Sequence, residues 1–355
     1  LNYNQVYGKV LGYERRKRKL SLEDLSSGLL SRTALENIEN GRAHCTKVIG
    51  DTLMLRMGIL PEYFESLASG AELERWRQRE DICLLIPATP DAATEKIRTY
   101  RETYENRDPL EEQFLLKAEV ILMLTSAPPN SPPSQPNQRQ TSGTKEPLIL
   151  TKARQTVECT VRAGWEQSLN AFCLSPGELE AILLFSAALF QVSRDAEAWK
   201  LWQAVWNYPQ EHLWKERAKT LILPQTAILG IRQVLTRNQP AGPSAVRIPL
   251  SETAPANRRI SARDMAAHGR KALELLRRNS CHCYVLPLLE NLCGLDADLF
   301  PDPKYPRQLH VFQEMFRELY TWFAYPGYRI WQGISVDNTR DAGMTLKMLR
   351  KFYGK

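Results

Sequence analysis

The side chains with the most specific chemistry lie between residues 20 and 41. Arg32, Thr33, Glu36 and Asn37 fall on the outward face of a short predicted helix. An arginine can donate two hydrogen bonds to guanine O6 and N7, and an asparagine can pair with adenine N6 and N7. Each such pair contributes roughly 1–3 kcal/mol of discrimination between bases. Arg32, Thr33 and Asn37 are therefore the candidates for contacts with base edges.

Two short helices joined by a tight turn must position these side chains. Ser21 can cap the first helix with Asp24 as the capping-box acid, and Ser31 can cap the second. Gly28 falls in the turn, and Gly41 ends the second helix. The apolar positions predicted to hold the helices together are Leu22, Leu25, Leu29, Leu35 and Ile38. Such a unit places its second helix in the major groove of DNA.

Positive charge is concentrated just before this unit. The chain of 355 residues has a net charge of +7, and its first 20 residues hold six basic residues and one acidic residue. The side chains predicted to contact phosphates are Arg15, Arg16, Arg18, Lys19, Ser21, Ser31 and Arg42. The alternatives are that the basic run is a solvated helix face, and that Asn37 only caps its helix or faces water.

The run from Leu25 to Arg42 resembles the helix-turn-helix of Cro/repressor-type regulators. Its Ile38-Glu39-Asn40-Gly41 segment matches their signature. The run from Leu25 to Ser31 is most similar to that of the Rgg/PlcR-like peptide-pheromone receptors, which have glycine before two apolar residues and serine. The match covers residues 5 to 66. Glu36 departs from the small polar residue of the family, so the base contact expected there differs or is absent.

The resemblance implies a body that binds a short signalling peptide, as in quorum sensing, and thereby shifts the affinity of the N-terminal unit for DNA. Asn207 and Asn291 are the amide side chains proposed to pair with the peptide backbone. Trp199, Trp202 and Trp206 form one stripe on a predicted helix. Core packing is the preferred interpretation of this stripe, and a peptide groove is the alternative.

The rest of the chain repeats pairs of amphipathic helices without strand alternation, which predicts an all-α fold. We expect a helix-turn-helix domain at 1–66, a linker helix at 67–87, and an α-solenoid of degenerate tetratricopeptide-like hairpins at 88–355. A generic helical bundle is the alternative. Two segments of linker composition, near 126–147 and 238–259, are predicted to be mobile insertions. The helices expected outside the 20–41 unit are 5–19, 46–57, 62–86, 91–105, 110–124, 148–163, 176–191, 194–207, 210–222, 225–237, 261–279, 284–293, 306–324 and 338–353.

Several function classes are disfavoured by the sequence. Phosphate-binding loops, dinucleotide turns, nucleophile elbows and H-E-x-x-H metal pairs are absent, so we expect neither catalysis nor a cofactor. Cys281, Cys283 and Cys293 lack the usual spacing of zinc ligands and are interpreted as core residues, with structural zinc as the alternative. No apolar run approaches the roughly 20 residues that span a bilayer, and no secretory signal is evident, which favours the cytoplasm.

The sequence therefore predicts a cytoplasmic transcription regulator with double-stranded DNA and a short linear peptide as partners. A homodimer is expected, because one helix-turn-helix contacts only a few base pairs and such proteins usually read two half-sites. Two alternatives remain open. The body is only a dimerisation or protein-partner scaffold, or the whole chain is a protein-interaction adaptor that does not bind DNA.

Overall fold

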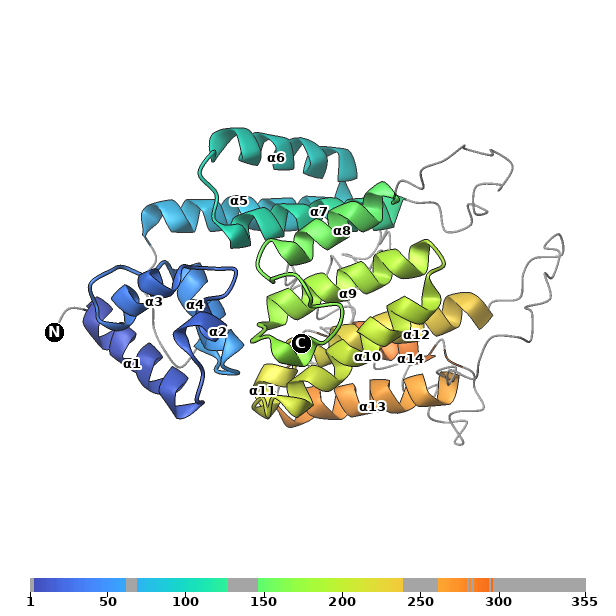
Figure 1. Ribbon diagram of the computed structural model, residues 1–355. Coiled ribbons are helices and arrows are strands. Elements are labelled where there is room, and N and C mark those ends of the chain that lie inside the picture. The colour runs from blue at the N-terminus through green and yellow to red at the C-terminus, as the bar shows by residue number, and fades with distance from the viewer. Residues whose placement is uncertain are drawn as a thin grey trace, which may run out of the picture.

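The structure is a computed structural model that describes residues 3–61, 69–126, 146–238, 261–279, 281, 284–293 and 295. Within these ranges every element of regular structure is a helix (Figure 1). The predicted all-α fold is confirmed. None of the described helices is both long and apolar enough to cross a bilayer.

The first four helices form a compact unit that we call the head, residues 3–60. They are α1 (Tyr3–Lys17), α2 (Leu22–Ser26), α3 (Arg32–Glu39) and α4 (Lys47–Arg56). Helix α3 packs across α1, and α2 packs against α3 and α4. Their shared core includes Tyr7, Leu11, Leu25, Leu29, Leu35, Ile38, Leu53 and Met54. Tyr7 of α1 faces this core, and the neighbouring Val6 is exposed.

The body, from residue 69 onward, is an array of helices in which most pack on the next and several on the one after it (Figure 1). This arrangement is the predicted α-solenoid, in which the helices stack along one direction over a continuous core. Its helices are α5 (Gly70–Ala88), α6 (Pro90–Thr103), α7 (Pro109–Ser126), α8 (Leu148–Glu158), α9 (Pro176–Gln191), α10 (Asp195–Glu211), α11 (Glu216–Lys219), α12 (Leu223–Asn238), α13 (Ala262–Arg278) and α14 (Val285–Cys293), with a 3-10 turn at Leu169–Ala171.

The predicted helix at 210–222 is wrong, because α10 continues through Pro209 and ends only at Glu211. A proline in a helix loses one backbone hydrogen bond. Here burial of Trp206, Tyr208 and Pro209 offsets that loss. The hydroxyl of Tyr208 also donates to the carbonyl of Phe172 at 2.8 Å, which holds the end of the helix to the preceding loop. Only the four residues of α11 are helical in the second half of the predicted range.

Several predictions concern residues outside the described ranges. The insertion near 126–147 falls largely on residues 127–145, and the one near 238–259 on residues 239–260. The expected helices at 306–324 and 338–353 and the expected domain boundary at residue 66 also lie outside. The domain limits therefore stay predictions. The predicted linker helix is described from residue 70 as α5, and it packs against α6 and α7.

Candidate nucleic-acid interface

Helices α2 and α3 are joined as the local sequence signals predicted. The Ser21 hydroxyl accepts from the backbone N–H of Asp24 at 3.0 Å, and the Asp24 carboxylate accepts from the backbone N–H of Ser21, which completes a capping box. The Ser31 hydroxyl accepts from the backbone N–H of Ala34 at 3.1 Å and so caps α3. Gly28 has a φ of +74°, which only glycine adopts without strain. The predicted caps and turn are confirmed.

The two faces of α3 differ sharply in polarity. Leu35 and Ile38 are buried against α1 and α2, while Arg32, Thr33 and Glu36 are exposed. Asn37 is half-buried, and its carbonyl accepts from the backbone N–H groups of Arg42 at 2.8 Å and Ala43 at 3.2 Å. Arg32, Thr33 and Glu36 are thus presented together to solvent from the first two turns of α3.

Two of the predicted phosphate ligands are instead engaged within the head. Arg15 forms an ion pair with Glu39 at 2.6 Å and donates to the carbonyl of Leu20 at 2.8 Å. The hydrogen bond to Glu39 raises the pKa of the Arg15 guanidinium. This pair ties the end of α1 to the end of α3. A phosphate would have to compete with the Glu39 carboxylate for Arg15.

Arg18 is held in the same manner. Its Nε donates to the carbonyl of Met57 at 2.8 Å, and its Nη1 pairs with the Glu14 carboxylate. The remaining predicted cations, Arg16, Lys19 and Arg42, are exposed. Lys19 has a φ of +57° and ends the basic run directly before the α2 cap. Arg16 stays exposed while its guanidinium lies 3.8 Å from the Glu39 carboxylate, whereas Arg15 and Arg18 are bound within the head.

A buried arginine connects the helix-turn-helix to the body. The side chain of Arg56, at the end of α4, is 2% exposed, and its partner Glu178 in α9 is 0% exposed. Arg56 Nε donates to Glu178 at 3.1 Å, and Nη2 donates to the other oxygen of the same carboxylate. Nη1 donates to the carbonyls of Leu25 and Ser27 at 2.7 and 2.8 Å. Arg56 therefore binds the end of α2 and the body at once.

The body approaches the turn between α2 and α3 directly. Arg56 Nη2 also donates to the carbonyl of Thr160 at 3.2 Å, and a Cβ added at Gly28 would lie 2.0 Å from that same carbonyl oxygen. At the exposed rim, Arg162 pairs with Glu23 of α2 at 3.5 Å. Glycine is required at residue 28 both for the backbone conformation and for the close contact with Thr160.

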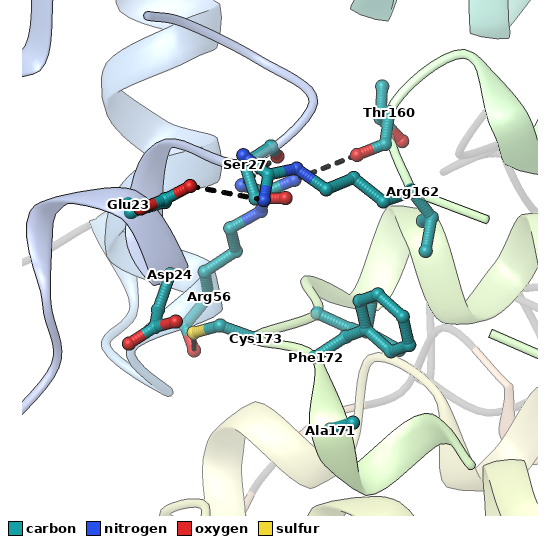
Figure 2. Close-up of a pocket in the computed structure, with 11 residues that line it drawn as sticks. Glu23, Asp24, Ser27, Arg56, Thr160, Arg162, Ala171, Phe172 and Cys173 are labelled. Atoms are coloured by element: carbon teal, nitrogen blue, oxygen red, sulfur yellow. Dashed lines mark hydrogen bonds and ion pairs between the residues drawn. The ribbon is translucent and has the colours of Figure 1, made fainter. Parts of the chain in front are cut away.

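A small cleft lies at this junction between the head and the body. Figure 2 shows Glu23, Asp24 and Ser27 on the head side, Arg162 and Cys173 on the body side, and Arg56 between them. Burial raises the pKa of the Cys173 thiol to about 12, so the thiol stays protonated at neutral pH. It donates to the backbone carbonyl of Arg56 at 3.2 Å and adds one more contact between head and body.

The residues predicted to bind a peptide lie apart from this junction. Asn291 is buried; its Nδ2 donates to the carbonyl of Pro287 at 2.7 Å, and its Oδ1 accepts from Arg232 at 3.2 Å. Asn207 is half-buried on α10. The amide of Asn291 is therefore used within the body in this structure, and the peptide contact remains a prediction.

The aromatic stripe on α10 packs largely inside. Trp202 and Trp206 are buried and stacked with ring centroids 5.9 Å apart, and the Trp202 indole N–H donates to the carbonyl of Thr226 at 2.6 Å. Trp199 is half-buried and meets Trp202 edge to face. The preferred interpretation of the stripe, core packing, holds for Trp202 and Trp206.

The structure describes only part of the candidate zinc site at Cys281, Cys283 and Cys293. Cys281 is half-buried, whereas the positions of Cys283 and of the Cys293 side chain lie outside what the structure describes. Among the described side chains, no three histidine, cysteine, aspartate or glutamate residues gather as metal ligands would.

Sequence reasoning missed the pair Arg56 and Glu178. Two signals were present. Arg56 interrupts the apolar run from Leu53 to Met57, and Ser175 followed by Glu178 has the spacing of a capping box, which the structure contains. Neither signal indicates that the two side chains meet, because they are separated by 122 positions in the chain.

Comparisons with known proteins give one structural similarity. No family model matches the chain, and no curated protein matches it. A solved structure with a similar arrangement is that of Bacillus thuringiensis PlcR in complex with the peptide PapR7 and DNA. It has 10% sequence identity and a TM-score of 0.48, and the alignment covers 92% of this chain and 99% of that one. At that level of similarity it assigns no function to this chain.

Proposed function

We propose that this protein is a DNA-binding transcriptional regulator that inserts α3 into the major groove of double-stranded DNA. The observation that carries the proposal is the exposed polar face of α3, where Arg32, Thr33 and Glu36 project from a helix whose other face is buried. Ser31, at the N-terminus of α3, is suited to a phosphate contact, because helix N-termini attract anions. The hydroxyl and backbone N–H of Ser21 already donate to the Asp24 carboxylate, so a phosphate would have to displace that carboxylate. The protein would act in the cytoplasm, where DNA is accessible.

Within this proposal the residues have separate roles. Arg32 contacts a guanine edge, and Thr33 and Asn37 contact neighbouring bases. The cations proposed for the phosphate backbone are Arg16, Lys19 and Arg42, which are exposed. Arg15 and Arg18 are left out of this surface because their guanidinium groups are bound to Glu39, Glu14 and backbone carbonyls. Glu36 would repel phosphates and restrict which bases fit beside it.

The test is DNA binding by the Arg32→Ala variant, measured on a duplex from the region upstream of its own gene and on a duplex of random sequence. We expect specific affinity to fall about 5- to 150-fold, with a smaller loss on the random duplex. Arg98→Ala, which removes an exposed arginine from α6 in the body, is the matched control. An equal loss on both duplexes would assign Arg32 to the phosphate backbone. If the unmodified protein bound neither duplex at low salt, the alternative of a protein-interaction adaptor that does not bind DNA would be favoured.

The finer proposal is that the body binds a short linear peptide and thereby changes the affinity of the head for DNA. Its physical support is the junction at Arg56, because any shift of α9 would act on Glu178 and hence on the carbonyls at the end of α2. A ligand changes DNA affinity only if it binds two states of the protein unequally. Calorimetric titration with synthetic peptides encoded beside the gene, with and without DNA, tests this coupling.

A second candidate is a body that serves only as a scaffold for dimerisation or for a protein partner. The burial of Trp202 and Trp206 and the internal hydrogen bonds of Asn291 favour it, since these groups are then structural. Peptides that leave both the heat of titration and DNA affinity unchanged would select the scaffold.

A further inference from the structure

The outward face of α5 carries a regular row of side chains. Leu73, Arg77, Glu80 and Leu84 are separated by four, three and four residues, which places them on one side of the helix. The opposite side faces the body, where Ile82 and Ile86 are buried. On that side Arg75 also pairs with Glu111 of α7 at 2.8 Å. We call the outward row the α5 seam.

Large apolar side chains are exposed in and beside the α5 seam. Leu73 is 45% exposed and Leu84 is 36% exposed, and Trp76, which borders the seam, is 52% exposed. Among the described residues, α5 is the first helix of the array, and no earlier helix of the body covers its outer face. Terminal helices of solenoids usually carry a polar outer face. An exposed tryptophan between two exposed leucines indicates a contact surface instead.

The charges of the α5 seam specify its partner. Arg77 and Glu80 are both exposed, and neither forms an ion pair with another side chain in the described parts of the chain. If two copies of α5 lie antiparallel about a twofold axis between residues 78 and 79, Arg77 of each copy faces Glu80 of the other. The same axis brings Leu73 of each copy to Leu84 of the other. A parallel pairing would instead oppose identical charges.

We propose that a second copy of this chain docks on the α5 seam, with the two α5 helices antiparallel. The contact is isologous, so the same residues of both copies form the interface and each contact occurs twice. The leucine pairs and Trp76 supply apolar burial, and the two reciprocal Arg77–Glu80 pairs fix the register, as polar pairs do in coiled coils. The proposal goes beyond DNA binding and does not depend on it.

Charge-reversal variants of the full chain test the pairing by sedimentation velocity over a concentration series without DNA. Arg77→Glu alone, or Glu80→Arg alone, creates two like-charge pairs in each dimer, and we expect the dimer dissociation constant to rise about tenfold or more. The double variant restores both pairs and should dimerise within about threefold of the original protein. Glu74→Arg, an exposed change on α5 outside the seam, is the matched control.

Mixing the two single variants gives a second and more specific test of the pairing. The Arg77→Glu chain carries two acids at the seam and the Glu80→Arg chain carries two bases, so each should fail to pair with itself and pair with the other. Heterodimer formation on mixing supports the seam, with thermal unfolding midpoints of both variants showing that they fold. A protein that stays monomeric throughout, single variants that dimerise normally, or a double variant that is not rescued would each overturn the proposal. Loss of DNA binding with normal pairing would overturn only the proposed function.

Discussion

The outward face of α3 and the junction at Arg56 use the same residue type for opposite purposes. Arg32 is exposed at the start of α3, while Arg56 is buried and donates to four different residues of the head and body. A buried guanidinium must have its donors satisfied, because leaving water costs several kcal/mol per ion. An exposed guanidinium keeps its hydration and can exchange it for a ligand. Desolvation therefore distinguishes the structural arginine, Arg56, from Arg32, which is proposed to contact DNA.

The comparison extends to the turn between α2 and α3. On the α3 side, the capping Ser31 and the residues after it face solvent. On the α2 side, Gly28 lies against Thr160 of the body, and Arg56 donates to the carbonyls of both Ser27 and Thr160. The body thus holds the helix-turn-helix from behind and leaves its polar face free. Three substitutions test this division between a rigid junction and an exposed surface.

The largest effect is expected from Glu178→Ala. It leaves the Arg56 charge buried and unpaired, so the free energy of unfolding should fall by about 3–5 kcal/mol. Chemical denaturation followed by circular dichroism measures this loss. Glu180→Ala is the matched control, because Glu180 lies two residues further along α9 and pairs with Lys117 at a partly exposed position. Its loss should stay within about 1 kcal/mol. Equal losses for the two variants would contradict the proposed importance of the junction.

Gly28→Ala should have the next largest effect. The new Cβ meets both a positive φ and the carbonyl of Thr160, and we expect a loss of about 2–4 kcal/mol in the free energy of unfolding. Gly164→Ala separates the two causes, since Gly164 has a φ of +96° but no atom within 4 Å of an added Cβ. That control should lose only about 1–2 kcal/mol. If Gly28→Ala lowers the free energy of unfolding no more than Gly164→Ala does, the Thr160 carbonyl does not contact Gly28 in solution.

The smallest effect on stability is expected from Arg32→Ala. Because Arg32 is exposed, thermal unfolding should shift by an amount equivalent to less than about 0.5 kcal/mol. The same variant is expected to lose DNA affinity, so stability and binding should separate at this residue. A destabilisation comparable to that of Glu178→Ala would place Arg32 within the fold of the head and remove it from the proposed interface.

Local patterns predicted the helices and their ends well. Ser21 with Asp24, Ser31 and Gly28 act within a few residues of themselves, so their spacing determines their roles. The fold class followed from the amphipathic repeats in the same way. The end of α10 did not, because Pro209 is a local stop signal that packing of Trp206 and Tyr208 overrides. Burial is a property of the whole fold and is invisible in a short window of sequence.

The roles of Arg15 and Arg18 could likewise not be predicted from the local sequence. The sequence placed Arg15 and Arg18 with the phosphate contacts, because both belong to a basic run beside the helix-turn-helix. The structure gives Arg15 the carboxylate of Glu39, 24 residues away, and gives Arg18 the carbonyl of Met57, 39 residues away. Composition locates positive charge in a segment, but only the packing of α1 against α3 and α4 shows which cations are already bound.

The amino-acid order alone therefore determined where most helices begin and end, α10 excepted, that the fold is all-helical, and which side of α3 is polar. These properties depend on capping and on the 3.6-residue period, which act over one or two turns of chain. Only the tertiary structure decided that Arg56 meets Glu178, that Thr160 touches Gly28, and that Leu73 and Trp76 of α5 are exposed. Those outcomes depend on which distant segments pack together, and that packing is set by the burial of the whole core.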